Sequence, residues 1–182
     1  MIEGKCIFLR AMEPEDMDCY WDMLNDPGVS DKVVGWSFPI SKHEQMEWYE
    51  RAIVDKRNMR FTIALKESKQ AVGMVTLSAI DWQNQSATHG IKLHSTCPKG
   101  KGIGTDAVMT LMKFAFDEVN LHRLDGSWID YNTASKKLYE KCGWNVEGTK
   151  KEAVYRNGKY HDLQIAGITK DEYIAIKERL GW

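Results

Sequence analysis

The 182-residue sequence predicts a single mixed α/β domain, residues 1–182, with a largely antiparallel central sheet flanked by helices. Apolar runs with strand and helix periods follow one another along the whole chain. A glycine-rich loop joins one of the strands to the clearest helix, and an Asn-Gly pair links the last two strands. No internal repeat or low-complexity tract divides the chain, and its length suits one domain with a sizeable core.

The N-terminal half predicts one strand, two helices and then three more strands. Pro14 stands where a first helical position tolerates proline, and Asp26-Pro27-Gly28 ends the helix that follows. Ser41 and Glu44 have the spacing of a capping box, which begins the second helix. Short β-rich runs bounded by turn residues predict the strands, which span residues 6–9, 61–65, 72–77 and 87–93.

The C-terminal half contains the clearest helical pattern. Apolar residues recur at i, i+3, i+4, i+7 and i+8 between Val108 and Phe116, which predicts a helix with one face on a sheet. Asn157-Gly158 favours a tight hairpin turn, and Thr169 with Glu172 caps a last helix. The strands of this half span residues 123–129, 144–155 and 160–168.

A short helix is expected between the strand at 123–129 and the hairpin. Asn132 or Thr133 serves as its N-cap, and Gly143 follows it at the C′ position. Helical spacing predicts a buried stripe of Ala134, Leu138 and Cys142. Tyr139 neighbours this stripe instead of continuing it.

The balance of charges limits the classes of partner that the protein can bind. The 25 Lys and Arg residues against 26 Asp and Glu give a net charge of −1, so the basic excess needed for nucleic-acid binding is missing. No run approaches the roughly 20 apolar residues of a membrane span, and residues 1–5 do not resemble a signal peptide. We therefore expect neither nucleic acid nor membrane as a partner.

The four cysteines are far apart in the sequence and include no C-x-x-C pair. This spacing favours free thiols in a reducing compartment, so we expect a cytoplasmic protein. The five histidines form neither an H-E-x-x-H motif nor another ligand spacing, and we predict no metal.

Seven residues ahead of the predicted helix at 108–116 carry the strongest chemical signal. Three glycines at alternate positions leave the backbone uncovered just before a helix, so N–H groups can bind an anion with help from the helix dipole. The spacing fits neither a dinucleotide G-x-G-x-x-G fingerprint nor a Walker loop. A loop that only joins strand to helix is the alternative. The residues are Lys99, Gly100, Lys101, Gly102, Ile103, Gly104 and Thr105.

Taken together with other motifs, this loop resembles that of the GNAT superfamily of acetyl-CoA-dependent N-acetyltransferases. The resemblance is strongest to the branch that includes the ribosomal-protein and spermidine acetyltransferases, and it covers most of the chain. Apart from the loop it rests on residues 120–124, 132–135, 138–144, 147–148 and 155–162.

The resemblance implies acetyl-CoA (coenzyme A) as cofactor and a GNAT fold. It assigns the pyrophosphate to residues 99–105, where Lys99 replaces the glutamine or arginine usual at the first position. The pantetheine arm is expected beside the backbone of Leu93, His94 and Ser95. Asn132 matches a cofactor-contacting asparagine and Ser135 belongs to the same motif, although Asn132 could also serve only as a helix cap.

Tyr139 matches the tyrosine that many members place beside the thioester sulfur as general acid. Its ordinary pKa near ~10 exceeds the ~8.5 of a thiol, so it retains a proton for the departing thiolate. The glutamate that serves as base in many relatives is missing, and His89 or Thr88 stands in its place. The alternatives are core packing for Tyr139 and a structural role for His89. The backbone N–H near Leu93 is the expected oxyanion donor.

Acceptor specificity in this fold comes from loops and from the last hairpin. Trp36 and Phe38 in the loop between the first two helices are candidates, with loop anchoring as the alternative. The hairpin candidates, for which cross-strand packing is the alternative, are Tyr155, Arg156, Tyr160 and His161.

The expected activity is transfer of an acetyl group to a primary amine, either a protein N-terminus or a small amine. No cysteine has the setting of a nucleophile, so direct attack by the amine is favoured. Acetylation of an aminosugar linked to a nucleotide, and a non-catalytic acyl-CoA-binding module, remain as alternatives. The resemblance also implies a homodimer.

Overall fold

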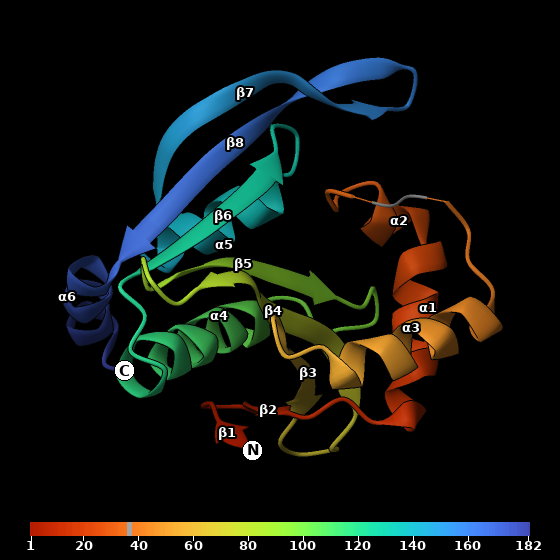
Figure 1. Ribbon diagram of the computed structural model, residues 1–182, viewed down its shortest axis with the longest axis horizontal. Helices are drawn as coiled ribbons and strands as arrows, with labels where there is room; N and C mark the ends of the chain where they lie inside the picture. The colour runs from red at the N-terminus through yellow and green to blue at the C-terminus, as the bar shows by residue number, and fades with distance from the viewer. Residues whose placement is uncertain (36–37) are drawn as a thin grey trace.

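The computed structural model describes residues 1–35 and 38–182, so the predicted acceptor residue Trp36 lies outside the described residues (Figure 1). The described part contains a mixed sheet with the strand order β1-β2-β3-β4-β5-β6-β8-β7. Neighbouring strands are antiparallel except β5 and β6, which are parallel. This confirms the predicted fold class. The strands are β1 (Ile2–Glu3), β2 (Ile7–Arg10), β3 (Met59–Leu65), β4 (Ala71–Asp81), β5 (Ser86–Leu93), β6 (Arg123–Ile129), β7 (Asn145–Arg156) and β8 (Lys159–Thr169).

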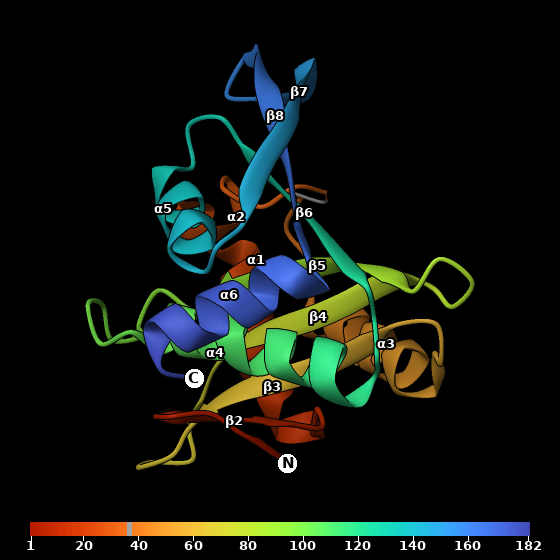
Figure 2. The same cartoon turned by 90° about the vertical axis from the view of Figure 1, so that its left-hand side faces the viewer.

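Helices cover both faces of this sheet (Figures 1 and 2). The larger core lies between the sheet and α4, α5 and α6, and a smaller methionine-rich core lies on the opposite face under α1 and α3. A 3₁₀ turn at Pro14–Asp16 precedes α1, and a π turn at Phe114–Glu118 follows α4. The α-helices are α1 (Met17–Asn25), α2 (Pro27–Ser30), α3 (Lys42–Val54), α4 (Ile103–Lys113), α5 (Thr133–Lys141) and α6 (Lys170–Leu180).

The central strands separate along their length. β5 pairs with β6 only where Ser86–Thr88 lies beside Arg123–Asp125. Beyond this point β6 continues to pair with β8 as far as Ile129, while the rest of β5 pairs only with β4. The parallel pair therefore opens into a wedge between residues 89–93 and 126–129.

Several local predictions are confirmed. Ser41 and Thr169 each form a complete capping box, and Asn157 and Gly158 have the positive φ values, 51° and 81°, of a tight hairpin turn. The sequence did not predict β1 or α2. Asp26 accepts a hydrogen bond from Gly28 N, so the residues that end α1 also begin the one-turn helix α2. No helix in the described part combines the length and apolar character that crossing a membrane requires.

Candidate active site

The glycine loop has an open backbone at the start of α4. Gly100 and Gly102 have φ values of +74° and +76°, a backbone conformation that residues with a side chain rarely adopt. Apart from their chain neighbours, no atom lies within 4 Å of the place that a Cβ would occupy on either glycine. Gly102 is the N-cap and supplies no capping side chain. Among the described residues no acceptor binds the N–H groups of residues 103–105, which precede the first α4 hydrogen bond, from Asp106 N to Gly102 O. These unpaired amides fit an anionic group such as a diphosphate.

Gly104 connects this loop to β5 and α5. A Cβ at Gly104 would lie 3.4 Å from side-chain atoms of both Leu93 and Leu138. The first turn of α4 therefore packs beside the end of β5 and the helix that carries Tyr139. Packing brings the predicted loop and Tyr139 into one region of the fold.

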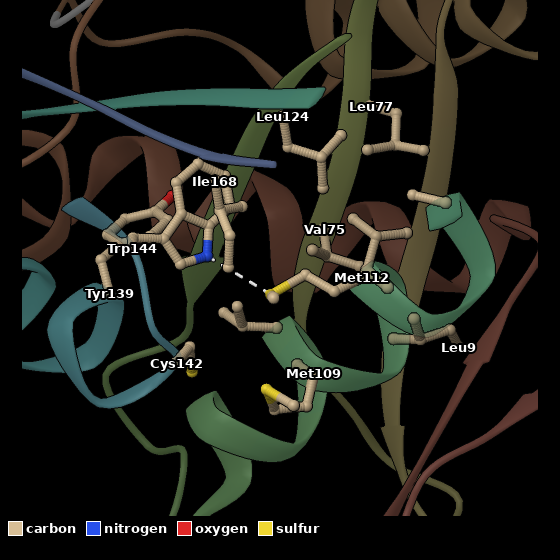
Figure 3. Close-up of a cluster of buried hydrophobic side chains, with 14 of the residues drawn as sticks. Leu9, Val75, Leu77, Met109, Met112, Leu124, Tyr139, Cys142, Trp144 and Ile168 are labelled. Carbon is tan, nitrogen blue, oxygen red and sulfur yellow. Dashed lines mark hydrogen bonds between the residues drawn. The ribbon is translucent and has the colours of Figure 1, made fainter. Parts of the chain in front are cut away.

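Tyr139 lies in the wedge between β5 and β6. Its ring stacks on Trp128 of β6 with centroids 5.4 Å apart, and its hydroxyl oxygen lies 2.9 Å from His89 Nδ1 of β5. Trp144 packs edge-on against the same ring at 4.9 Å (Figure 3). Tyr139 and His89 are each 3% exposed, so their contact is shielded from solvent.

The predicted buried stripe of α5 was partly wrong. Ala134 is exposed and Leu138 only half-buried, whereas Tyr139 and Cys142 are buried. The physical reason is aromatic packing, because the Tyr139 ring stacks on Trp128 and packs edge-on against Trp144. Gly126 of β6 makes room for Trp144, since a Cβ there would lie 3.0 Å from the Trp144 ring.

Burial controls protonation in this pair. Desolvation raises the pKa of Tyr139 far above its ordinary value, and it lowers the pKa of His89 to about 3. At neutral pH a protonated phenol therefore faces a neutral imidazole. The role of general base for His89 stays a prediction, and its environment weighs against it because so low a pKa makes a weak base.

The predicted residues after β5 face another part of the fold. His94 Nδ1 lies 2.8 Å from Thr96 Oγ1, and the His94 and Ser95 side chains line a cavity of about 330 Å³ beside α1. Asp22 and Asp26 line the same cavity. Leu93 lies beside the glycine loop. The expected passage of the pantetheine arm along the backbone of residues 93–95 stays a prediction.

Asn132 is the N-cap of α5, as one of its two interpretations predicts. Its Oδ1 accepts from Ser135 N at 3.1 Å, and its Nδ2 donates to Ser135 Oγ at 2.9 Å and to Lys32 O at 3.1 Å. A cofactor contact by Asn132 or Ser135 stays a prediction. The bond to Lys32 ties α5 to the segment that follows α2.

Two further side chains hold that segment, and with Asn132 we call them the loop clasp. The Tyr131 hydroxyl donates to Asp31 O. Arg156 Nη2 donates to Val33 O at 3.3 Å and to Gly35 O at 3.0 Å. Sequence reasoning missed Tyr131 and proposed Arg156 only as a pocket residue, because backbone carbonyls about 100 residues away leave no local pattern.

Two of the predicted acceptor residues lie close to the turn of the long β7–β8 hairpin. Tyr155 and Tyr160 face each other across the last pairs before the β7–β8 turn, both exposed, with ring centroids 5.0 Å apart. His161 packs edge-on against Tyr131 at 4.6 Å, and Phe38 is exposed. Figure 1 shows this hairpin as an arm that reaches toward α2.

Comparison with known proteins identifies the class. Residues 7–145 match the model of the acetyltransferase (GNAT) domain. The chain is 29% identical over 171 residues to the SPβ prophage-derived uncharacterized N-acetyltransferase YokL of Bacillus subtilis, which covers 93% of each chain. It is 26% identical to the spermidine N(1)-acetyltransferase of Vibrio cholerae, with 93% of this chain and 96% of that protein covered.

A solved structure supports the same relationship. The spermidine N-acetyltransferase from Vibrio cholerae in complex with CoA and spermine superposes with a TM-score of 0.85 at 26% identity, covering 94% of this chain and 99% of that one. The chain therefore belongs to the GNAT acetyltransferase family, as the resemblance indicated. It is an N-acetyltransferase, and acetyl-CoA is the acyl donor that enzymes of this family use.

Proposed function

We propose that this enzyme transfers the acetyl group of acetyl-CoA to a primary amine by direct attack, with a peptide N-terminus or a small amine as acceptor. The single observation that supports the proposal most is the Tyr139 hydroxyl, held in the wedge where β5 and β6 cease to pair. A protonated phenol at this point can supply the proton that a departing thiolate needs.

Backbone N–H groups, more than side chains, would bind the acetyl-CoA. The unpaired N–H groups of residues 103–105 would hold the diphosphate of acetyl-CoA, with Lys99 and Lys101 as exposed cations beside it. The bound thioester supplies the activated acyl group. The Leu93 side chain lies near Gly104 at the start of α4.

Tyr139 would act as general acid. Burial keeps its proton in place at neutral pH, and Trp128 and Trp144 fix the plane of its ring. The amine must arrive neutral or lose its proton through water, because an ammonium has no lone pair for attack.

Charges near α1 bear on the acceptor. A polyamine acceptor would be favoured by clustered carboxylates that lack other partners. Asp16 is instead bound by Arg10 at 2.7 Å, Asp18 by Lys42 at 2.7 Å, and Asp26 caps α2. A peptide N-terminus carries one amine and needs no such cluster, so both acceptor types belong in the test.

The test is thiol release from acetyl-CoA in the presence of peptides, spermidine and aminosugars. Turnover with a peptide or a small amine, and none without acceptor, supports the proposal. Turnover with nucleotide-linked aminosugars alone would replace the acceptor class. Coenzyme A binding without turnover on any acceptor would indicate a non-catalytic module.

A further inference from the structure

The hydroxyl of Tyr139 has one polar side-chain partner among the described residues, and that partner is His89. Both groups are buried, and the surrounding rings of Trp128 and Trp144 leave them little freedom. The other ring nitrogen of His89, Nε2, is buried and has no hydrogen-bond partner in the described part of the chain. The pair is therefore isolated from any longer network of side chains.

The two neutral tautomers of His89 differ in which buried donor is left without a partner. With the proton on Nε2, a buried N–H would be orphaned, and Tyr139 would have to donate its own proton to Nδ1. With the proton on Nδ1, His89 donates to Tyr139 Oη, and the donor left without a partner among the described residues is the Tyr139 O–H. That unpaired O–H is the proton that a general acid must present to its substrate.

We infer that His89, protonated at Nδ1, is a positioning residue that donates to Tyr139 Oη and turns the tyrosine proton toward the reacting thioester. This inference rests on the proposed role of Tyr139 as general acid. The histidine at position 89 therefore does not replace the missing general base. It orients the general acid, Tyr139. The same hydrogen bond strengthens when Tyr139 becomes a phenolate.

The proton inventory balances without a further reactant. When Tyr139 acts, its O–H bond breaks and an S–H bond forms on the departing thiolate. The phenolate oxygen keeps the electron pair and accepts the His89 Nδ1–H bond, while His89 keeps its proton throughout. Tyr139 then recovers a proton, through solvent, that the attacking nitrogen releases as it becomes an amide.

Two substitutions at one position separate donation from packing. His89→Phe keeps a ring and removes the donor, and we expect kcat to fall about 10- to 100-fold with the KM for acetyl-CoA within about 2-fold. His89→Asn places an amide N–H where Nδ1 stood, and we expect it to recover most of the kcat although it fills the space less well. A role in packing alone would give the reverse order, with Asn worse than Phe, and would overturn the inference.

The Phe variants at positions 139 and 89 distinguish a failure of this inference from a failure of the proposed function. If Tyr139→Phe is impaired and His89→Phe is as active as wild type, the inference is wrong and the general acid stands. If Tyr139→Phe itself keeps full activity, the proposed role of Tyr139 is wrong. In the double variant His89→Phe with Tyr139→Phe, we expect no loss beyond that of Tyr139→Phe alone.

A spectroscopic measurement does not depend on whether the variants fold. Long-range ¹H–¹⁵N correlation on the uniformly labelled wild-type enzyme reports which ring nitrogen of each histidine carries the proton. His89 is identified by its failure to titrate down to about pH 5. We expect the proton on Nδ1, and a proton on Nε2 would overturn the inference.

Discussion

Two regions of this enzyme are built by different means. The glycine-loop half, made of β5, residues 99–105, α4 and α5, depends on close backbone approach and buried rings. The hairpin half consists of residues 31–35 and the β7–β8 hairpin. Residues 31–35 are held by the loop clasp, in which Arg156 of the hairpin and two residues at the start of α5, Tyr131 and Asn132, donate to backbone carbonyls. The comparison teaches that the first half is fixed by packing, whereas the second is held by a few polar contacts that substitution can release.

The largest expected effect is on chemistry in the glycine-loop half. Tyr139→Phe should lower kcat about 100-fold or more and change the KM for acetyl-CoA by less than about 2-fold, because only proton donation is lost. Steady-state kinetics checks this. The matched control is Tyr173→Phe, which removes the hydroxyl of another buried tyrosine, bonded to Asp117 of the π turn after α4. Equal effects of the two changes would contradict a special role for Tyr139.

Protonation of His89, which lies in the glycine-loop half, should make the free energy of unfolding of the protein depend on pH. Burial lowers the pKa of His89 to about 3 in the folded state, against about 6.5 unfolded, so between these values the unfolded chain binds more protons. The free energy of unfolding should therefore fall as pH decreases below about 6.5, by about 1.4 kcal/mol per pH unit from this group at most.

Denaturant titrations of wild type and His89→Phe test this dependence. Between pH 7 and pH 5 we expect the wild-type free energy of unfolding to fall by about 2 kcal/mol more than that of the variant. Buried carboxylates such as Asp16 lose stability in the same direction at lower pH, but they are common to both proteins. Parallel curves for the two proteins would show that His89 is not buried in the neutral form.

A smaller effect is expected in the hairpin half, and it should not change the binding of acetyl-CoA. Arg156→Ala removes the bonds to Val33 O and Gly35 O, so the segment after α2 loses its link to β7. We expect the KM for the acceptor to rise about 10-fold while the KM for acetyl-CoA stays constant. The control is Arg51→Ala, an exposed arginine on α3 whose nearest ion-pair partner, Glu47, is 3.8 Å away. A rise in the KM for acetyl-CoA would show that the two halves are not separable.

The same contrast explains what the sequence could predict. Signals that are complete within a few residues succeeded: the capping box at Ser41, the Asn157-Gly158 turn and the positive φ of Gly143 after α5. The glycine loop belongs to this group, since three glycines and the following helix are contiguous. Local spacing suffices because the backbone conformation there depends on neighbouring residues.

Contacts between distant segments could not be predicted in this way. His89 and Tyr139 are 50 residues apart, and Tyr139 is buried by ring packing against Trp128, which lies on another strand, and Trp144. The clasp residues bind backbone carbonyls, which every residue has, so no side-chain pattern marks the segment they hold. Strand β1, only two residues long, gave no periodic signal at all.

The central claim is that the backbone at the start of α4 holds the acyl donor, and calorimetric titration with acetyl-CoA tests it most directly. Gly102→Ala and Gly181→Ala each place a methyl group on a left-handed glycine with open space around it, so both should cost about 1 kcal/mol of stability. We expect acetyl-CoA to bind wild type and Gly181→Ala equally, and Gly102→Ala at least about 10-fold more weakly. Equal binding by all three proteins, or none by folded wild type, would contradict the account.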